Sequence, residues 1–486
     1  MDPVTSIRPL LAVAVAGLAA LAVLFLKNRE RYRDAVSPVA AVVMFAIVAS
    51  MAPAVLAGRT VDLKLFEILP GVDFAFRVDA LGMVFATVSS LLWIAASIYS
   101  IGYMRALNEH AQTRFYACFA TSLAAAVGGA FAANLFTLVI FYEALSLVTY
   151  PLVYHHEDEE AWTGSRKYLV YLMGASKSVL LAALALTYSI AGSLDFTPGG
   201  LLAGTGASAP LLTAVYFCYL FGFAKSAVMP MHAWLPAAMV APTPVSALLH
   251  AVAVVKMGVF CVLRVIFDVF GTGLVAALGL GVATAYLVSF TILTASIYAL
   301  TRDDLKARLA YSTVSQLSYI VLGAVLLSPV AMVGGIIHIA VHAFSKITLF
   351  FCAGSIYCAS GKRNISDMAG IGRRLPWTMG AFFVGSLSMI GIPPTGGFVS
   401  KWYLALGSVE AGEVAFLVVL LVSSVLNAAY FLPVSYVAFF GAEPDNAAPV
   451  REIPMIAIPL VATAILSVAV GLFPGYFIAL AERVVG

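Results

Sequence analysis

The sequence has 486 residues, of which 62% are hydrophobic and only 10% are charged, and its formal net charge is +3 at pH 7. Soluble globular proteins carry about 25% charged residues, so this composition excludes an ordinary soluble enzyme. No basic run is long enough to indicate a nucleic-acid partner. Because about 20 apolar residues suffice for one membrane crossing, the composition predicts an all-α polytopic membrane protein in the lipid bilayer.

Fourteen apolar stretches that are long enough to cross a membrane follow one another along the chain. They cover residues 8–26, 38–57, 80–102, 115–132, 135–153, 168–191, 210–239, 242–266, 273–300, 308–328, 330–359, 378–405, 414–440 and 453–480. The seventh stretch contains Pro230 and Pro236, and the twelfth contains Pro393 and Pro394. Since proline removes a backbone donor and frees a carbonyl one turn earlier, we predict that helices 7 and 12 are broken at these residues.

The two predicted breaks are five spans apart, which indicates an internal repeat. A unit of five helices crosses the membrane an odd number of times, so a second copy enters from the opposite side. We therefore expect three N-terminal helices in residues 1–113, two inverted five-helix repeats in residues 114–267 and 268–440, and a C-terminal helix in residues 441–486.

The basic residues of the connections predict the orientation of the chain. Numbered from the N-terminus, the odd-numbered connections hold sixteen lysines and arginines. The even-numbered connections and the two terminal segments, on the opposite side of the membrane, hold six. The positive-inside rule then places the N- and C-termini on the non-cytoplasmic side of the cell membrane.

Ionisable residues inside the predicted spans are the candidates for function. A charge at the bilayer centre costs about 2.5–3.5 kcal/mol on insertion scales, so such residues must face one another or internal water. One mid-span acid, Glu143, accompanies five mid-span lysines, which are Lys177, Lys225, Lys256, Lys346 and Lys401.

Glu143 needs a cationic partner, and we predict that this partner is Lys225. The proton affinity of a buried lysine depends on whether a carboxylate lies beside it, so movement of Glu143 relative to Lys225 would gate a proton carrier. The alternative is a static ion pair that fixes helix packing. For Lys256 the alternative is a side chain that extends to the membrane interface. Lys177 either tunes the region of Glu143 or reaches that interface.

Three residues of the eleventh stretch share one helix face. His338, His342 and Lys346 are spaced four residues apart and fall within about 80° of a helix circumference. Histidine titrates near neutrality, so this stripe favours a stepwise proton relay over structural hydrogen bonding or a metal site. His250 fits a relay or a packing role equally. We interpret Lys401, which follows the second predicted break, as a terminal proton station.

The sequence offers no motif for a cofactor. Its five cysteines form no CxxC pair, and there is no GxGxxG, P-loop or haem-attachment motif, so we expect neither a cofactor nor a metal. The run from His155 to Glu160 resembles a metal-binding tract. We interpret it as a solvated cytoplasmic loop, and the next alternative is a docking site for a neighbouring subunit.

Two segments resemble motifs of a known family. Residues 309–319 read LAYSTVSQLSY, which is similar to the family's LAYSSISQLGY, and residues 241–250 read APTPVSALLH, as the family's motif does. Residues 76–82 and 391–401 also fit the sequence pattern of this family. The chain thus resembles the antiporter-like subunits shared by respiratory complex I, membrane-bound hydrogenases and Mrp cation/proton antiporters, from about residue 70 to its end.

This resemblance implies fourteen helices with inverted five-helix repeats and proton translocation through Glu143, Lys225, Lys256 and Lys401. It also implies that the histidines of the eleventh span link two half-channels. One departure follows residues 234–236, where the family often places an acid and then a histidine but this chain has Ala237 and Met239. We do not transfer roles to that loop.

A lysine at position 401 resembles the D-type subunit of Mrp antiporters more than the middle subunit of complex I. The predicted function is therefore that of a proton-translocating subunit in a multisubunit monovalent cation (sodium)/proton antiporter. It would work with other membrane subunits and perform no chemistry of its own. The alternative is a proton-pumping subunit of a redox-driven complex, of the NADH:quinone oxidoreductase or membrane-bound hydrogenase type.

Overall fold

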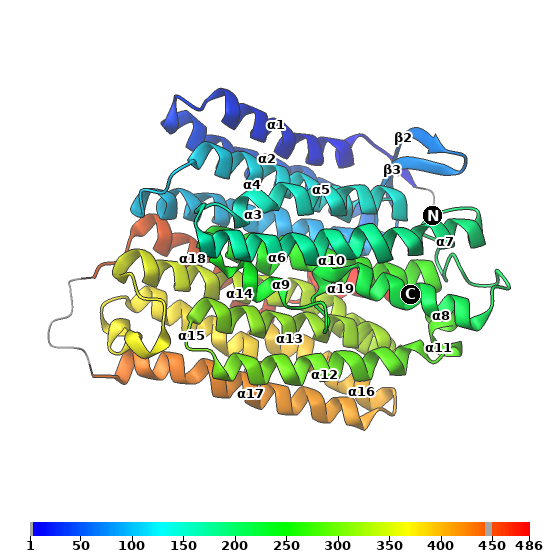
Figure 1. Ribbon diagram of the computed structural model, residues 1–486. Coiled ribbons are helices and arrows are strands. Elements are labelled where there is room, and N and C mark those ends of the chain that lie inside the picture. Colours follow the sequence, from blue (N-terminus) through cyan, green and yellow to red (C-terminus); the bar gives the residue numbers. More distant parts are fainter. Residues whose placement is uncertain (1–2, 443–449) are drawn as a thin grey trace.

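The computed structural model describes residues 3–442 and 450–486, so residues 443–449 of the predicted C-terminal segment lie outside the described part. Long helices lie side by side in one elongated bundle (Figure 1). Nine helices among the described residues are long and apolar enough to cross a membrane. The predominantly helical, multi-pass membrane fold predicted from the composition is therefore confirmed.

The N-terminal part combines helices with a small sheet. Its helices are α1 (Arg8–Phe25), α2 (Glu30–Leu56), α3 (Ala80–Ala106), α4 (Gln112–Ala130) and α5 (Leu135–Val153). Strand β2 (Val61–Leu69) pairs antiparallel with β3 (Val72–Val78) and parallel with the short β1 (Val4–Thr5). The prediction of an all-α chain missed this sheet, although apolar and polar residues alternate from Val61 to Leu65, which is the period of a strand.

The middle of the chain is rich in short and irregular helical segments. These are α6 (Glu159–Ala175), the π-helix η1 (Ser176–Leu180), α7 (Leu181–Ala191), α8 (Ala209–Gly222), η2 (Ala224–Ser226), α9 (Trp234–Ala237), η3 (Ala238–Val240), the π-helix η4 (Val245–Ala253), α10 (Val254–Arg264), the π-helix η5 (Val265–Phe270) and α11 (Thr272–Ala277). Regular helix stops at Gly222 and resumes only at Trp234, in the stretch that contains Pro230.

The C-terminal half returns to long helices. They are α12 (Leu280–Thr301), α13 (Leu305–Val325), α14 (Pro329–Ser360), α15 (Pro376–Ile390), α16 (Gly396–Glu410), α17 (Val414–Phe440), α18 (Pro454–Leu472) and α19 (Gly475–Val485), with short turns η6 (Ile365–Met368) and η7 (Ile371–Arg373). The last apolar stretch is thus two helices instead of one, with Pro474 between them. Strand β1 and the C-terminus lie at the same end of the bundle (Figure 1).

Side-chain caps explain several of the helix starts. Asn134 accepts a hydrogen bond from the Thr137 amide at 2.8 Å, which separates α5 from α4 in a nearly continuous apolar sequence. Asp158 caps α6 and Asp304 caps α13 in the same manner. Such a cap contributes about 1 kcal/mol to helix stability.

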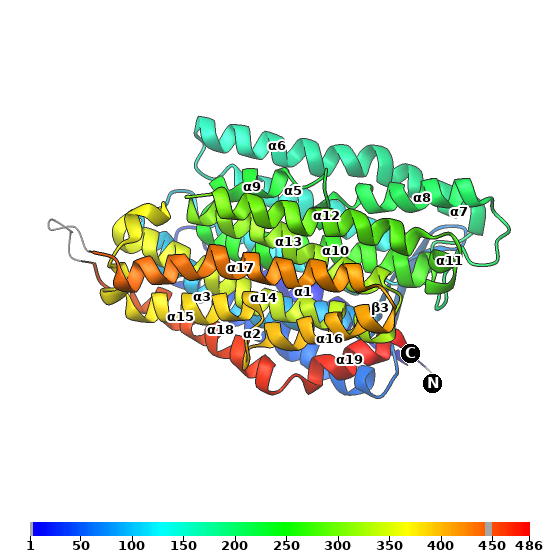
Figure 2. The same ribbon diagram turned by 90° about the horizontal axis from the view of Figure 1, so that it is seen from below.

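Helix α14 is the central helix of the bundle (Figure 2). Every residue from Ala331 to Ile356 is buried, and α3, α13, α15, α16 and α18 all contact it. A helix that is apolar on all sides belongs in such an interior position. The surrounding helices shield its few polar side chains from lipid.

Candidate functional site

Most of the predicted site residues lie in the interior of the bundle. Lys225, Lys256, Lys346 and His342 are 0% exposed, and His250 and His338 are 1% and 2% exposed. We refer to five residues on α10, α14 and α16 as the central polar row, namely Lys256, His338, His342, Lys346 and Lys401.

Lys225 lies in η2, where the helix that begins with α8 is interrupted. Its Nζ donates hydrogen bonds to the carbonyl of Tyr142 at 2.8 Å and to Oγ of Ser146 at 2.6 Å. Tyr142 and Ser146 are four residues apart and share one face of α5. This structure therefore does not contain the predicted Glu143–Lys225 ion pair, because Glu143 lies on a different face of the same helix.

Glu143 pairs with Lys177 instead. The Lys177 Nζ lies 3.0 Å from Oε2 of Glu143, and the side chains are 54% and 13% exposed, respectively. The contact lacks hydrogen-bond geometry, so neither carboxylate oxygen has a hydrogen-bond partner among the described residues. Lys177 belongs to the π-helix η1, an element that occurs frequently at functional sites. Of the two roles left open for Lys177, the structure favours the one beside Glu143.

A glycine brings α10 against the backbone of Lys225. A Cβ atom at Gly258 would lie 2.2 Å from the carbonyl carbon of Lys225 and 2.1 Å from the amide nitrogen of Ser226. No side chain fits in that space. Gly258 therefore fixes how closely the interrupted helix approaches α10, the helix that carries Lys256.

Lys256 and His342 are in direct contact in the centre of the bundle. The Lys256 Nζ donates to the Ala251 carbonyl at 2.9 Å and lies against Nδ1 of His342. With Nδ1 accepting, the proton of a neutral His342 is on Nε2, which has no partner among the described residues. The π-helix η4 ends directly before α10, so Lys256 follows an irregular turn.

His338 lies one helical turn before His342, and their ring centroids are 5.9 Å apart. The His338 Nδ1 is 2.8 Å from Oγ of Ser400, and Nε2 is 3.0 Å from Oε1 of Gln316. Because that amide oxygen accepts, Nε2 donates and Nδ1 receives the Ser400 hydroxyl. Both ring nitrogens of His338 are therefore engaged with neutral partners.

Three side chains connect Lys346 to the second interruption. The Lys346 Nζ donates to Oγ of Ser312 at 2.8 Å. The Tyr430 hydroxyl lies 3.0 Å from that Oγ and also contacts Oδ1 of Asn427. Asn427 Nδ2 then donates to the Met389 carbonyl at 3.2 Å.

Lys401 occupies the end of this connection. Its Nζ donates to the carbonyls of Met389 at 2.8 Å and Ile390 at 2.9 Å. In a continuous helix these two carbonyls would accept the amides of residues 393 and 394, four residues later. Pro393 and Pro394 have no amide hydrogen, so the carbonyls are free for the lysine.

His250 lies apart from these connections. It is buried next to the rings of Tyr168 and Trp234, at centroid distances of 5.9 and 6.2 Å. Neither of its ring nitrogens has a hydrogen-bond partner within the described chain. Its role, like that of the other relay residues, stays a prediction.

The neutral residues that connect the charged ones were not predicted from the sequence. Gln316, Asn427 and Tyr430 are fully buried. The two amides could have been found, because a search for polar side chains inside apolar stretches marks Gln316 and Asn427 as readily as the lysines. Tyr430 gives no such signal, since tyrosine is common in membrane helices.

Comparisons with known proteins agree on one family. The sequence matches the family described as "NADH:quinone oxidoreductase/Mrp antiporter, TM" over residues 132–427 and "NADH-Ubiquinone oxidoreductase (complex I), chain 5 N-terminus" over residues 70–116. It is 34% identical over 380 residues to NADH-quinone oxidoreductase subunit N of Desulforudis audaxviator, which covers 78% of this chain and 75% of that protein.

Antiporter proteins are among the relatives as well. A component of a probable K(+)/H(+) antiporter of Rhizobium meliloti is 34% identical over 368 residues, which are 74% of this chain but only 36% of that protein. In fold, the chain is similar to a chain of the Mrp complex from Dietzia sp. DQ12-45-1b, with a TM-score of 0.86 and 23% identity over 99% of this chain and 97% of the other. These matches confirm the family resemblance drawn from the motifs.

Proposed function

The chain belongs to the family of membrane subunits shared by NADH:quinone oxidoreductases and Mrp antiporters, and we propose that it is the proton-translocating subunit of a multisubunit monovalent cation/proton antiporter. One observation carries this proposal: Lys256, His342 and His338 form a run of ionisable side chains inside a bundle that excludes lipid from them. Buried ionisable groups in a membrane protein are the expected components of a proton path.

The proposed path uses residues that were predicted from the sequence. Protons pass from the region of Glu143 and Lys225 to Lys256, then along α14, and leave through Lys401. Buried serine, tyrosine and asparagine side chains support the last step, because they connect Lys346 by hydrogen bonds to the Met389 carbonyl, to which Lys401 also donates. Sodium as the coupled cation stays a prediction from the resemblance.

Gating in this proposal depends on which lysine holds Glu143. In the structure the carboxylate is beside Lys177, and Lys225 is held by the Tyr142 carbonyl and Ser146. The second arrangement has Glu143 paired with Lys225 and Lys177 released. Exchange between the two changes the charge next to Lys225, which is the condition for capturing and releasing a proton.

The topology that we propose has fourteen spans with two inverted five-helix repeats. The nine long helices account for part of it, and shorter apolar helices such as α8 and α15 account for more. The proposal is supported by the positions of the two interruptions, one after Gly222 and one after Ile390, each with a lysine of the path beside it.

The test is replacement of Lys256 by methionine, which keeps the length of the side chain and removes its charge. In everted vesicles that contain the assembled complex, we expect cation-induced proton movement to fall to the background of vesicles without the complex. Lys64→Ala is the control, because Lys64 is 61% exposed on β2, and it should keep wild-type transport. Normal antiport by an assembled Lys256→Met complex would refute the proposal.

The redox-driven alternative is favoured by one observation, the similarity to a subunit of NADH-quinone oxidoreductase. The two functions differ in what energises proton movement. Proteoliposomes with the purified complex should move protons when a sodium or potassium gradient is imposed without any electron donor. Proton movement that requires an electron donor, together with co-purifying iron–sulfur subunits, would establish the alternative.

A further inference from the structure

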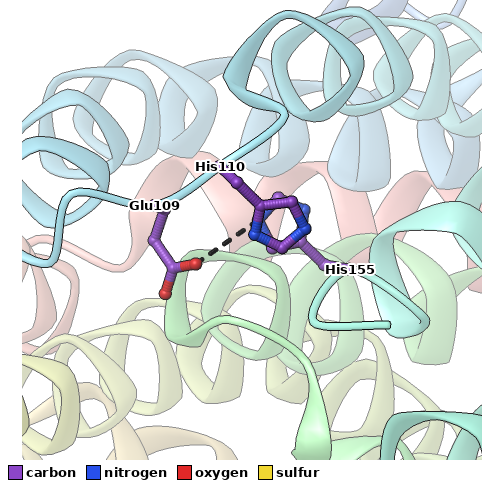
Figure 3. Close-up of side chains that lie close together, drawn as sticks. All are labelled: Glu109, His110 and His155. Carbon is purple, nitrogen blue, oxygen red and sulfur yellow. Dashed lines mark ion pairs between the residues drawn. The ribbon is translucent and has the colours of Figure 1, made fainter. Parts of the chain in front are cut away.

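Four potential metal ligands meet where two connections approach each other at one end of the bundle. Glu109 and His110 lie between α3 and α4, and His155 and His156 lie between α5 and α6. Figure 3 shows Glu109, His110 and His155 converging, with one ligand atom of each within 4.8 Å of the others. The imidazole of His110 stacks on that of His155 at a centroid distance of 4.8 Å.

His155 is the unexpected member of this cluster. It is 0% exposed, so its interpretation as part of a solvated loop is wrong. Neither of its ring nitrogens has a hydrogen-bond partner among the described residues. Buried polar groups are normally hydrogen-bonded, whereas this imidazole has only an ion-pair contact with the Glu109 carboxylate at 3.6 Å, which leaves it able to bind a ligand that is not protein.

The distances within the cluster suit a small metal ion. The two oxygens of Glu109 lie 3.6 Å from Nε2 of His155 and 3.4 Å from Nε2 of His156. Donor atoms at about 2.0–2.1 Å from a tetrahedral zinc ion are roughly 3.4 Å from one another. His110 is exposed, so its ring can turn toward the same point without disturbing the core.

Neighbouring charges leave the cluster available to a cation. Arg114 lies close, and its Nη2 donates to the His155 carbonyl at 3.2 Å. Its guanidinium charge is balanced by Glu157, whose Oε1 is 2.5 Å from Nη1. His156 also lines a cavity of about 340 Å³, whose lining includes three acidic residues (Asp158, Glu160 and Asp304) and three basic ones (Lys306, Lys362 and Arg363), so the cluster adjoins a polar cavity.

We propose that Glu109, His110 and His155, with His156 as the fourth ligand, form a binding site for a divalent transition-metal ion of the zinc type. Imidazole ligands select such ions over magnesium and calcium, which prefer oxygen ligands. The ion would join the α3–α4 connection to the α5–α6 connection. It would thereby fix the end of α5, the helix that carries Glu143, in a manner independent of the proton path.

The test measures metal bound to the purified, chelator-treated complex after equilibration with Zn²⁺, and the visible spectrum after equilibration with Co²⁺. We expect Glu109→Gln and His155→Asn to bind one Zn²⁺ per chain fewer than wild type and to lose a cobalt band typical of tetrahedral nitrogen and oxygen ligands. His232→Asn is the matched control, a histidine of another loop, and should keep both.

His110→Ala guards the test against misfolding, because this side chain is exposed and its one ring contact is with His155 in the same cluster. We expect at least tenfold weaker Zn²⁺ binding in this variant, with the complex assembled normally. Equal Zn²⁺ stoichiometry and equal cobalt spectra in wild type, His110→Ala and Glu109→Gln would overturn the proposal. The absence of any Zn²⁺ above background in the wild-type complex would overturn it too.

Discussion

The hydroxyl of Tyr430 occupies the middle of the connection between Lys346 and Lys401. It lies between Oγ of Ser312 and Oδ1 of Asn427, and no other side chain among the described residues bridges these two atoms. At the scale of single residues, this uncharged hydroxyl is therefore the central member of the connection that the proposed proton path uses.

Removal of this hydroxyl by Tyr430→Phe should slow proton transport about tenfold. A hydrogen bond contributes about 1–1.5 kcal/mol, and 1.36 kcal/mol in a barrier corresponds to a factor of ten in rate. The measurement is the initial rate of cation-driven proton movement in vesicles. Tyr436→Phe is the control on the same helix, since Tyr436 is 66% exposed. An unchanged rate in Tyr430→Phe would show that protons take another route.

The contact partners of single residues could not be predicted from the sequence. The cost of burying charge identified the lysines and Glu143 without a structure. It could not identify partners, because Glu143 is next to Tyr142 in the sequence but lies on a different face of α5 from the one that Tyr142 and Ser146 share. The choice between Glu143 and the Tyr142 carbonyl as the partner of Lys225 depends on how α5 is rotated against η2, which no sequence period specifies.

At the scale of elements, the interruption between α15 and α16 forms a binding site for the ammonium group of Lys401. Two successive prolines leave two successive carbonyls without amide donors, and Lys401 occupies both. The stretch from residue 391 to 395 therefore positions a charged group as well as interrupting a helix.

The double substitution Pro393→Ala with Pro394→Ala should lengthen α15 and displace Lys401. The new amides would compete for the Met389 and Ile390 carbonyls, so we expect transport to fall at least tenfold while the complex still assembles. Pro376→Ala is the matched control, because a proline in the first turn of α15 replaces no helical hydrogen bond. Wild-type transport in the double variant would contradict this role of the prolines.

Element boundaries were predictable where the sequence marks them. The predicted stretches 135–153 and 414–440 coincide with α5 and α17. The β2–β3 hairpin was missed because hydrophobic stretches were sought at membrane length, whereas these strands are nine and seven residues long. The π-helices η1 and η4 left no signal, since one extra residue in a turn hardly alters an apolar sequence.

At the scale of the whole molecule, the central position of α14 buries a charged side chain, which lowers stability but suits a functional site. Lys346 is 0% exposed and has only the Ser312 hydroxyl and the Leu309 carbonyl as hydrogen-bond partners in the described structure. Replacing a buried charge by an apolar side chain of similar size is often neutral or stabilising. A side chain retained at a cost in stability is expected at a functional site.

Lys346→Met should therefore abolish transport and raise the stability of the complex by about 1 kcal/mol or more. Thermal unfolding of the purified complex, followed by intrinsic fluorescence, measures the second quantity. Ile347→Ala is a destabilising reference on the same helix, because it opens a cavity at a fully buried position. Lower stability of Lys346→Met with transport intact would reverse this interpretation.

The uneven exposure of the lysines has a consequence for how subunits communicate. Lys225, Lys256 and Lys346 are enclosed, whereas more than half of the Lys177 side chain lies on the surface of this chain while its ammonium touches Glu143. A charged group on an adjoining subunit that attracts or repels Lys177 alters how firmly the carboxylate is held. In the proposed gating, Lys177 is therefore the residue through which the charge of a neighbouring subunit acts on Glu143.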